Sequence, residues 1–363
     1  MTSVAPDYAG ACITGLAPAL VGNQPAPWMP EPVVEARAVV LLVLDGLGWN
    51  ALERHPELLP VLGGMSGGRI TTVAPSTTGC ALTSITTGLA PSQHGIVGFR
   101  FRIDDSVLNV LGWLRADRRP PPDPFTIQRF DPFLGRRVPV VTKSEFRRTG
   151  FSEAHLRGLD FRGWSAVSSL VEHCRRLVTA GERFVYAYYP SVDNVAHSHG
   201  LLDGFYQAEL AAADRLVGDL LSALPSDAAL LVTSDHGQIH LEPDSWVALD
   251  DVDDLVSIYA GDARFRYLHA RSGAAADLRK AAEELVGDQA WVLSRDELFE
   301  IGWLGPDPSP AARRRVGDVT LAARAPVGFV DPQLLQETKL RSAHGSVTPD
   351  EMWVPLLAGR GRG

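Results

Sequence analysis

The sequence predicts an α/β protein whose mainly parallel central sheet is covered by helices on both faces. Three runs, at 38–46, 183–190 and 228–237, are almost continuously hydrophobic. A strand with one solvent-exposed face would instead alternate apolar and polar residues. Continuous runs of this kind are typical of parallel strands that helices cover on both sides. The segment 203–224 precedes the third run and places apolar residues at helical spacing, which predicts an amphipathic helix.

The predicted elements follow one another in an order that leaves polar residues at the strand ends. The first run, AVVLLVLDG, predicts a strand that ends at the acid Asp45. The segment STTGCALTSITTG predicts a helix from about Thr78, with Ser76 or Thr77 as its N-cap and Gly88 as its stop. The runs RFVYAYYP and AALLVTSDHG predict two further strands followed by polar residues. Ligands of open α/β sheets gather at such carboxyl ends, so these residues are candidates for a functional site.

We expect residues 1–363 to form a single catalytic domain with two insertions near the rim of this site. The first, at about 101–160, is rich in Arg, Asp and Pro, as in RADRRPPPDPF, and predicts a surface insertion. The second, at about 264–335, begins with a strand–helix pair in RFRYLHARSGAAADLRKAAEELVG and continues as irregular chain.

Composition narrows the class of protein and of partner. The chain is 45% hydrophobic and 21% charged, as is usual for a globular protein. Its formal net charge of −9 argues against a nucleic acid polymer as partner, because such binding depends on clustered Lys and Arg. No apolar run reaches the roughly 18 residues of a membrane helix, and a basic signal-peptide segment is missing. Three cysteines without a CxxC motif complete the expectation of a reduced, cytoplasmic protein with no membrane partner.

Six Asp and His residues follow the predicted strands or lie in a late loop. They are Asp45, Asp193, His197, Asp235, His236 and His344. Asp193 and His197 are spaced so that one helical turn brings both to one face. Taken alone, each of the six also fits a turn, a helix cap or a structural or solvent-facing histidine. Together they offer six N and O ligands, enough for two divalent cations, of which zinc suits the mixed Asp and His set.

A hydroxyl at the start of the predicted helix adds a candidate nucleophile. Thr78 would lie beside unpaired backbone N–H groups at the positive end of the helix dipole, a place that favours an alkoxide and a phosphoryl oxygen. A threonine hydroxyl is too weak an acid to attack at neutral pH unless something activates it, and direct metal coordination is one way. Without the downstream Asp and His residues, Thr77 and Thr78 would be interpreted only as helix caps.

The order of the motifs is similar to that of a known superfamily. The segments VLDG, PSTT…TTGLAPSQHGIVG, YPSVDNVAH, SDHG and AHG…EMWVPLLAGRG resemble the alkaline phosphatase superfamily, and within it the nucleotide pyrophosphatase/phosphodiesterase branch. The resemblance covers about 38–100, 183–240 and 338–360 and leaves both insertions unmatched. It implies an alkaline phosphatase-like fold and a threonine nucleophile, which lies three residues after Pro75 and nine before Thr87 and is therefore Thr78.

The resemblance also implies two zinc ions and distributes the ligands between them. Asp45, Asp235 and His236 would hold one ion together with Thr78, and Asp193, His197 and His344 would hold the second. One departure from the branch is Ala81, where an asparagine commonly donates to the phosphoryl oxygen. The sequence does not identify a replacement for that donor.

These features predict a metal-dependent hydrolase of phosphate diesters or pyrophosphates, acting on a small phosphate ester. A phosphomonoesterase, phosphonate hydrolase or phosphomutase of the same superfamily is one alternative, and a non-catalytic metal-binding homologue is another. A sulfatase is disfavoured, because Cys80 is followed by Ala-Leu-Thr-Ser and not by the formylglycine motif of that branch. The natural substrate cannot be read from the sequence, since specificity would lie in the two unmatched insertions, and oligomeric state leaves no sign.

Overall fold

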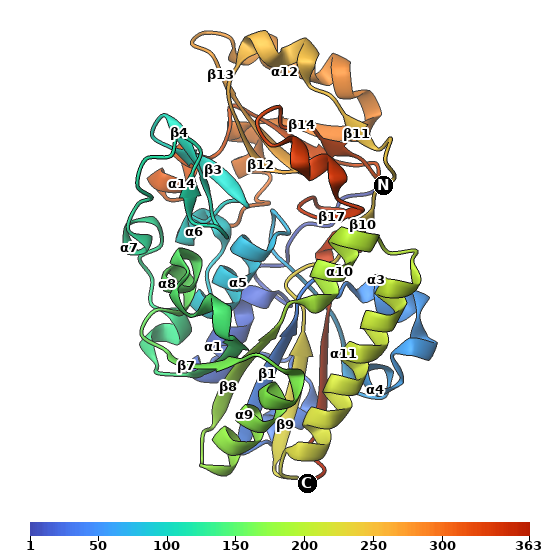
Figure 1. Ribbon diagram of the computed structural model, residues 1–363. Coiled ribbons are helices and arrows are strands. Elements are labelled where there is room, and N and C mark those ends of the chain that lie inside the picture. The colour runs from blue at the N-terminus through green and yellow to red at the C-terminus, as the bar shows by residue number, and fades with distance from the viewer.

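A seven-stranded sheet forms the centre of the computed structural model, which describes residues 1–363 (Figure 1). Its strands are β1 (Ala38–Leu44), β2 (Ser66–Thr71), β6 (Pro139–Lys143), β7 (Asp160–Trp164), β8 (Phe184–Tyr189), β9 (Ala228–Thr233) and β18 (Trp353–Arg360). They lie in the order β2-β18-β9-β1-β8-β6-β7, and only β18 runs against the others. The predicted mainly parallel sheet is confirmed.

Both faces of the central sheet are buried, as the continuous apolar runs predicted. Along β1, Val39 and Leu41 pack into one hydrophobic core, while the alternate residues Val40 and Leu42 pack into a second core on the opposite face. All seven residues of β1 are buried, so neither face of the strand presents a side chain to solvent. The first polar position is therefore Asp45, immediately after the strand.

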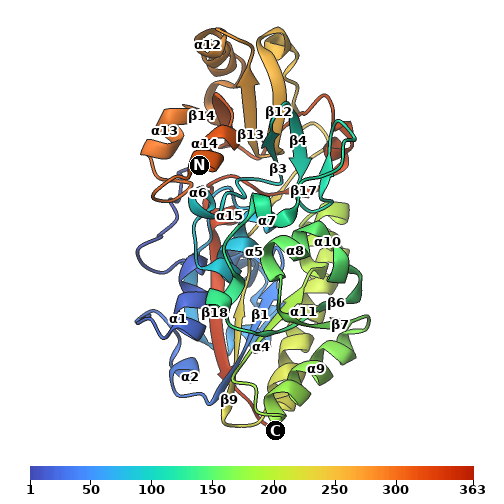
Figure 2. The ribbon, with the colours of Figure 1, turned by 90° about the vertical axis from the view of Figure 1, so that its left-hand side faces the viewer.

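Helices cover the two faces of the sheet. Helices α9 and α11 lie on one side of the central strands, and α1 lies on the other side (Figure 2). The core on one face is formed with α3 (Trp49–Arg54), α4 (Pro60–Gly63), α9 (Val167–Thr179), α10 (Ser191–His199) and α11 (Gly204–Ala223). The core on the other face is formed with α1 (Leu16–Gly22), α2 (Glu31–Val34), α5 (Thr78–Thr87) and α8 (Gly150–Leu156). The helix predicted at 203–224 is α11, and the helix predicted from Thr78 to Gly88 is α5.

A second sheet lies above the central one in Figure 1. It is antiparallel, in the order β12-β13-β15-β14, and comprises β12 (Val256–Asp262), β13 (Phe265–Ala270), β14 (Ala290–Ser294) and β15 (Val319–Ala323). Helix α12 (Ala275–Val286) packs on it around a separate hydrophobic core. The predicted strand–helix pair is present as β13 and α12. The chain after it, which we expected to be irregular, instead supplies β14 and β15, whose five residues each are too few to give a clear periodicity.

The segment expected as the first insertion divides into two parts. Its start forms a three-stranded sheet of β3 (Arg100–Ile103), β4 (Ser106–Asn109) and β5 (Leu114–Arg115), followed by α7 (Pro124–Ile127). Its end does not lie outside the core, because β6 returns to the central sheet between β8 and β7. The segment outside that sheet therefore ends near residue 138. The sequence did not reveal β6, because its five residues follow a run of Arg and Pro and are too few to show a periodicity.

The remaining elements are short. They are α6 (Pro91–His94), α13 (Arg295–Glu300), α14 (Pro310–Arg315), α15 (Pro349–Met352), and 3-10 helices at Ile13–Gly15, Pro56–Leu58, Pro132–Gly135, Ser144–Arg148, Asp250–Leu255, Gly287–Gln289 and Leu335–Lys339. Two pairs of short strands join distant segments, β10 (Ile239–His240) with β17 (Ser342–Ala343) and β11 (Trp246–Val247) with β16 (Gly328–Phe329). None of the helices combines the length and apolar character that crossing a membrane requires.

Candidate active site

Three aspartates lie side by side because they follow three adjacent parallel strands. The strands β9, β1 and β8 are neighbours, so their carboxyl ends meet at one edge of the sheet. Asp45 follows β1, Asp193 lies in the first turn of α10 after β8, and Asp235 lies two residues beyond β9. The backbone N–H of Asp193 donates to the carbonyl oxygen of Asp45 at 3.0 Å, which joins two of these segments directly.

One group of possible metal ligands consists of Asp45, Asp193 and His236, whose ligand atoms lie within 4.8 Å of one another. The Nε2 atom of His236 lies 3.5 Å from Oδ1 of Asp45 and 3.4 Å from Oδ2 of Asp235. The hydroxyl oxygen of Thr78 lies 3.2 Å from the same Nε2 atom. All five residues are buried, so the charges of this group are shielded from bulk water.

A second group consists of Asp193, His197 and His344. The Nε2 atom of His197 lies 3.3 Å from Oδ2 of Asp193, one turn earlier on α10, as the i and i+4 spacing predicts. His344 comes from the far end of the chain because β17 pairs with β10, and its Nε2 atom lies 3.8 Å from Oδ1 of Asp193. The resemblance assigned Asp193 to this group alone, whereas in the structure it belongs to both groups.

The three histidines share one orientation. In each, Nδ1 contacts a backbone carbonyl oxygen: His197 that of Ser342 at 2.8 Å, His236 that of Gly237 at 3.1 Å, and His344 that of Ser76 at 2.8 Å. A carbonyl oxygen only accepts, so Nδ1 carries the proton and donates. In the neutral rings the lone pair of each Nε2 then faces the aspartates. Backbone carbonyls commonly orient metal-binding histidines in this way.

The carboxylates of this site are not satisfied by the protein itself. Oδ1 of Asp45, Oδ1 of Asp193 and Oδ2 of Asp235 are buried and have no hydrogen-bond partner. Burial, together with the charges of Asp235 and Asp193, raises the pKa of Asp45 well above its ordinary value. These three unpartnered oxygens and the nearby imidazole lone pairs repel one another unless a cation lies between them. The donor set therefore fits divalent cations with mixed O and N ligands.

Thr78 is the first residue of α5. Thr77 occupies the N-cap position in extended conformation, but its side chain makes no capping hydrogen bond. The first backbone N–H groups of a helix have no partner within it, so they are free to meet an anion beside Thr78. The helix ends at Gly88, whose φ of 74° is a left-handed conformation that favours glycine.

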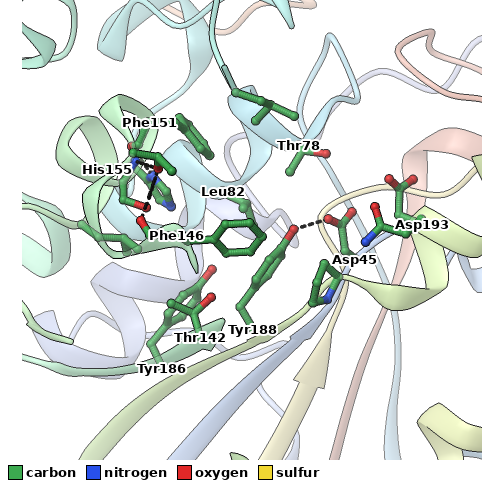
Figure 3. Close-up of a pocket in the computed structure, with 16 residues that line it drawn as sticks. Asp45, Thr78, Leu82, Thr142, Phe146, Phe151, His155, Tyr186, Tyr188 and Asp193 are labelled. Atoms are coloured by element: carbon green, nitrogen blue, oxygen red, sulfur yellow. Dashed lines mark hydrogen bonds between the residues drawn. The ribbon is translucent and has the colours of Figure 1, made fainter. Parts of the chain in front are cut away.

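Two cavities meet at Thr78. The first, of about 270 Å³, lies toward segment 142–156, and Figure 3 shows Phe146, Phe151 and His155 on its side opposite Thr78. The second, of about 390 Å³, lies toward β4 and the Leu335–Lys339 helix. Four residues line both cavities: Thr78, Leu111, Asp193 and Asn194. A group attacked by Thr78 therefore has space on two sides.

A family model described as type I phosphodiesterase / nucleotide pyrophosphatase matches residues 39–346, which is most of the chain. The chain belongs to this family. It is therefore a phosphoryl hydrolase of the alkaline phosphatase superfamily. The family is metal-dependent, and the two groups of possible ligands at the sheet edge agree with that dependence.

Solved structures of other proteins share the fold. Human ectonucleotide pyrophosphatase/phosphodiesterase 5 superposes with a TM-score of 0.68 at 15% identity, covering 88% of this chain and 87% of that one. An inactive threonine-to-alanine variant of the murine protein, in complex with AMP, gives a TM-score of 0.69 at 15% identity, covering 89% and 87%. Phosphonoacetate hydrolase from Sinorhizobium meliloti 1021, in complex with phosphonoformate, gives 0.63 at 17% identity, covering 99% and 94%. No curated protein matches this chain.

Both cavities of this phosphodiesterase family member are poor in positive charge. No Lys or Arg lines either of them. The second cavity instead contains Asp262 and Glu337. Burial raises the pKa of Asp262 to about 7, so this carboxyl group is largely uncharged below neutral pH. Charge on a bound phosphate must therefore be met by cations and by backbone N–H groups.

The sequence analysis did not identify three polar residues that lie at the site of this phosphodiesterase family member. Tyr188, at the end of β8, donates its hydroxyl to Oδ2 of Asp45, and a buried strand gives no sign of such a role. Asn194 follows Asp193 and lines both cavities. Asn109, the last residue of β4, lines the second cavity, which Thr78 also lines. Ala81 lines neither cavity and is fully buried in the core, so its methyl group supplies no donor to the site.

Proposed function

We propose that this protein is a phosphodiesterase or pyrophosphatase in which Thr78 is the nucleophile and two zinc ions are the cofactors. The observation that carries the proposal is the place of Thr78, where two groups of possible metal ligands and two cavities meet. The inactive threonine-to-alanine variant of the murine neighbour supports a threonine in this role. The buried, free thiols of all three cysteines support a cytoplasmic location.

Six side chains would hold the ions. Asp45, Asp235 and His236, with Thr78, would hold one, and Asp193, His197 and His344 would hold the other, with Asp193 placed to contact both. When bound, such a pair of cations stabilises the negative charge on the attacking and leaving oxygens of a displacement at phosphorus. Zinc is preferred over magnesium or calcium because three of the six ligands are imidazoles.

The chain itself supplies the nucleophile and its surroundings. The Thr78 oxygen forms a bond to phosphorus while the bond to the leaving oxygen breaks, and water later releases the phosphoryl group from Thr78. The N–H groups at the start of α5 are placed to donate to a phosphoryl oxygen. Gly79 allows Val110, the residue after β4, to lie close to this helix, since a Cβ atom at position 79 would lie 3.1 Å from Cγ1 of Val110.

The two cavities support a diester as the substrate. A diester carries two organic groups on phosphorus, and there is one cavity on each side of Thr78 for them. A diester also carries one negative charge, whereas a monoester dianion would lack a Lys or Arg partner in either cavity. The AMP bound to the murine neighbour and the phosphonoformate bound to the bacterial one support a small phosphate ester or related anion.

A substrate panel tests this proposal. For the zinc-loaded enzyme we expect kcat/KM to be at least about tenfold higher for bis(4-nitrophenyl) phosphate than for 4-nitrophenyl phosphate, which corresponds to about 1.4 kcal/mol of transition-state binding. Phosphonoacetate is the third substrate, with release of free phosphate as the readout. A preference for the monoester or the phosphonate would reject the proposed phosphodiesterase and identify a phosphomonoesterase or a phosphonate hydrolase instead. Tight binding of two zinc ions without turnover of any substrate would identify a non-catalytic homologue.

Asn109 is the candidate for the donor that position 81 does not supply. Its Oδ1 accepts from the N–H of Gly112 at 2.9 Å, so the amide is held in place and its NH₂ group remains free to donate. We expect Asn109→Ala to lower kcat about 10²- to 10³-fold, the usual effect of losing one donor to a developing oxyanion. Steady-state kinetics on the aryl diester checks this, with KM changing much less than kcat.

The variant Asn109→Asp separates donation from structure. It keeps the size of the side chain and the oxygen that accepts from Gly112, but it has no N–H to donate. We expect it to be as impaired as Asn109→Ala. Full activity of Asn109→Asp would exclude the proposed role of Asn109.

A further inference from the structure

A third cavity, of about 390 Å³, concentrates arginines away from the active site. It lies where α14 packs against β3, and the first residue of α13 also lines it (Figure 2 shows the three elements). Four of the side chains that line it are arginines: Arg102 from β3, Arg295 from α13, and Arg314 and Arg315 from α14. We call it the arginine pocket. It shares no lining residue with the two cavities at Thr78.

Three of the four guanidinium groups in the arginine pocket have no carboxylate partner. Arg102 donates to the backbone carbonyl of Asp104 at 2.8 Å, and Arg315 donates to two backbone carbonyls, including that of Ile127 at 3.2 Å. Arg314 is exposed and forms no ion pair, whereas the neighbouring Arg313 pairs with Asp296 at 3.5 Å. Only Arg295 is paired, with Asp318 at 2.8 Å.

The one acidic residue that lines the arginine pocket does not neutralise it. The carboxylate of Asp104 is 78% exposed and lies 3.7 Å from Nη1 of Arg115, which lines no part of the pocket. Its contribution to Arg102 is a backbone carbonyl, which carries no formal charge. The pocket therefore keeps an excess of positive charge in a protein whose formal net charge is −9.

Neighbouring groups respond to this positive charge. Burial and the charge of Arg314 lower the pKa of Arg315 to about 10. Burial and the charge of Arg102 lower the pKa of His269 to about 3. The guanidinium of Arg315 lies over the ring of Phe101 at 4.9 Å, so its plane is fixed by packing as well as by hydrogen bonds. Like charges held together in this way are stabilised when an anion binds between them.

We propose that the arginine pocket binds a small phosphate anion with at least two negative charges, of the diphosphate kind. The planar guanidinium donates two parallel hydrogen bonds to phosphate oxygens, and arginines on separate segments can contact adjacent phosphoryl groups. Arg102 and Arg314 are the two side chains with the most unused donors, so we infer that they make the principal contacts. This inference concerns a second ligand site and does not depend on the reaction proposed for Thr78.

Isothermal titration of the zinc-loaded enzyme with methylenediphosphonate tests the arginine pocket. We expect the double variant Arg102→Ala/Arg314→Ala to lose one binding event that the wild type shows, with affinity at that site at least about 100-fold weaker. This follows from a hydrogen bond to a charged group being worth about a factor of ten or more for each arginine. Inhibition of aryl diester hydrolysis by the same compound reports binding at the zinc site, and we expect its inhibition constant to be unchanged.

The matched control is Arg215→Ala, which removes an exposed arginine from α11, outside every cavity described. It should titrate like the wild type. A melting temperature no lower than that of the wild type shows that the double variant is folded, and neither of its two positions lines the active-site cavities. The same isotherm for all three proteins would overturn the proposal.

Discussion

Thr78→Ala is expected to lower kcat for an aryl phosphodiester by about 10⁴- to 10⁶-fold, the range seen when a covalent hydrolase loses its nucleophile. The hydroxyl of Thr78 lies at the start of α5, 3.2 Å from Nε2 of His236, and no other hydroxyl in this helix contacts a member of the two ligand groups. Each group of possible ligands keeps its Asp and His members in the variant. We therefore expect two zinc ions per chain to remain, measured by plasma mass spectrometry beside the kinetics.

Two further variants make the Thr78 result specific. Thr78→Ser keeps a hydroxyl and should retain much more activity than Thr78→Ala. Thr86→Ala removes a buried hydroxyl from the same helix, where it donates to the carbonyl of Leu82 at 3.0 Å, and should leave kcat unchanged. Wild-type turnover by Thr78→Ala would reject the nucleophile and leave the metal groups without an assigned reaction.

The arrangement of the central sheet could be predicted because its strands are buried on both faces. A continuous apolar run such as β1 carries that information in its own residues, and the first polar residue after it then falls at the sheet edge. The rule that ligands gather at carboxyl ends led from there to Asp45, Asp193 and Asp235. His344 is different, because its approach depends on the pairing of β17 with β10, which two residues of sequence cannot specify.

Residues whose role depends on a distant backbone atom could not be predicted. Ser76 is an example: its carbonyl accepts from His344, and its hydroxyl donates to the carbonyl of Ser346 at 2.6 Å. Asn109 and Tyr188 belong to the same class, since a strand residue shows no sign in sequence of the cavity that it lines or the carboxylate that it contacts. Such roles follow from packing between elements and not from local periodicity.

The electrostatics of the active site link these residues to the choice of substrate. The carboxylates of Asp45, Asp193 and Asp235 balance much of the charge that two dications would bring, and no Lys or Arg lines either cavity. With both cations bound, the net positive charge of the site would therefore be small. A singly charged diester suits such a site better than a dianion, because each unmatched charge in a buried site is costly. The arginine pocket, by contrast, has the unpaired guanidinium groups that a doubly charged anion requires.

Asp45→Asn is expected to change stability in opposite directions with and without metal. In the metal-free protein, Asp45 is buried beside Asp235 and Asp193, its Oδ1 has no partner, and its pKa is raised well above the ordinary value. Removing this charge relieves repulsion, so the metal-free variant should melt a few degrees above the metal-free wild type. Zinc binding stabilises the wild type. It stabilises the variant less, because an amide is a weaker zinc ligand than a carboxylate. Activity should fall by about 10³-fold or more, since loss of the cation removes several kcal/mol of charge stabilisation.

Asp214→Asn is the matched control for this experiment. Asp214 is also a buried aspartate, but its carboxylate accepts from the N–H groups of Val61 at 3.1 Å and Leu62 at 2.9 Å. Its removal should lower the melting temperature equally with and without zinc, because a satisfied carboxylate stabilises the fold by itself. Thermal melts of the three proteins in chelator and in zinc give the comparison. If Asp45→Asn behaved as Asp214→Asn does, the buried aspartates would be ordinary structural carboxylates and the cation site at the sheet edge would be rejected.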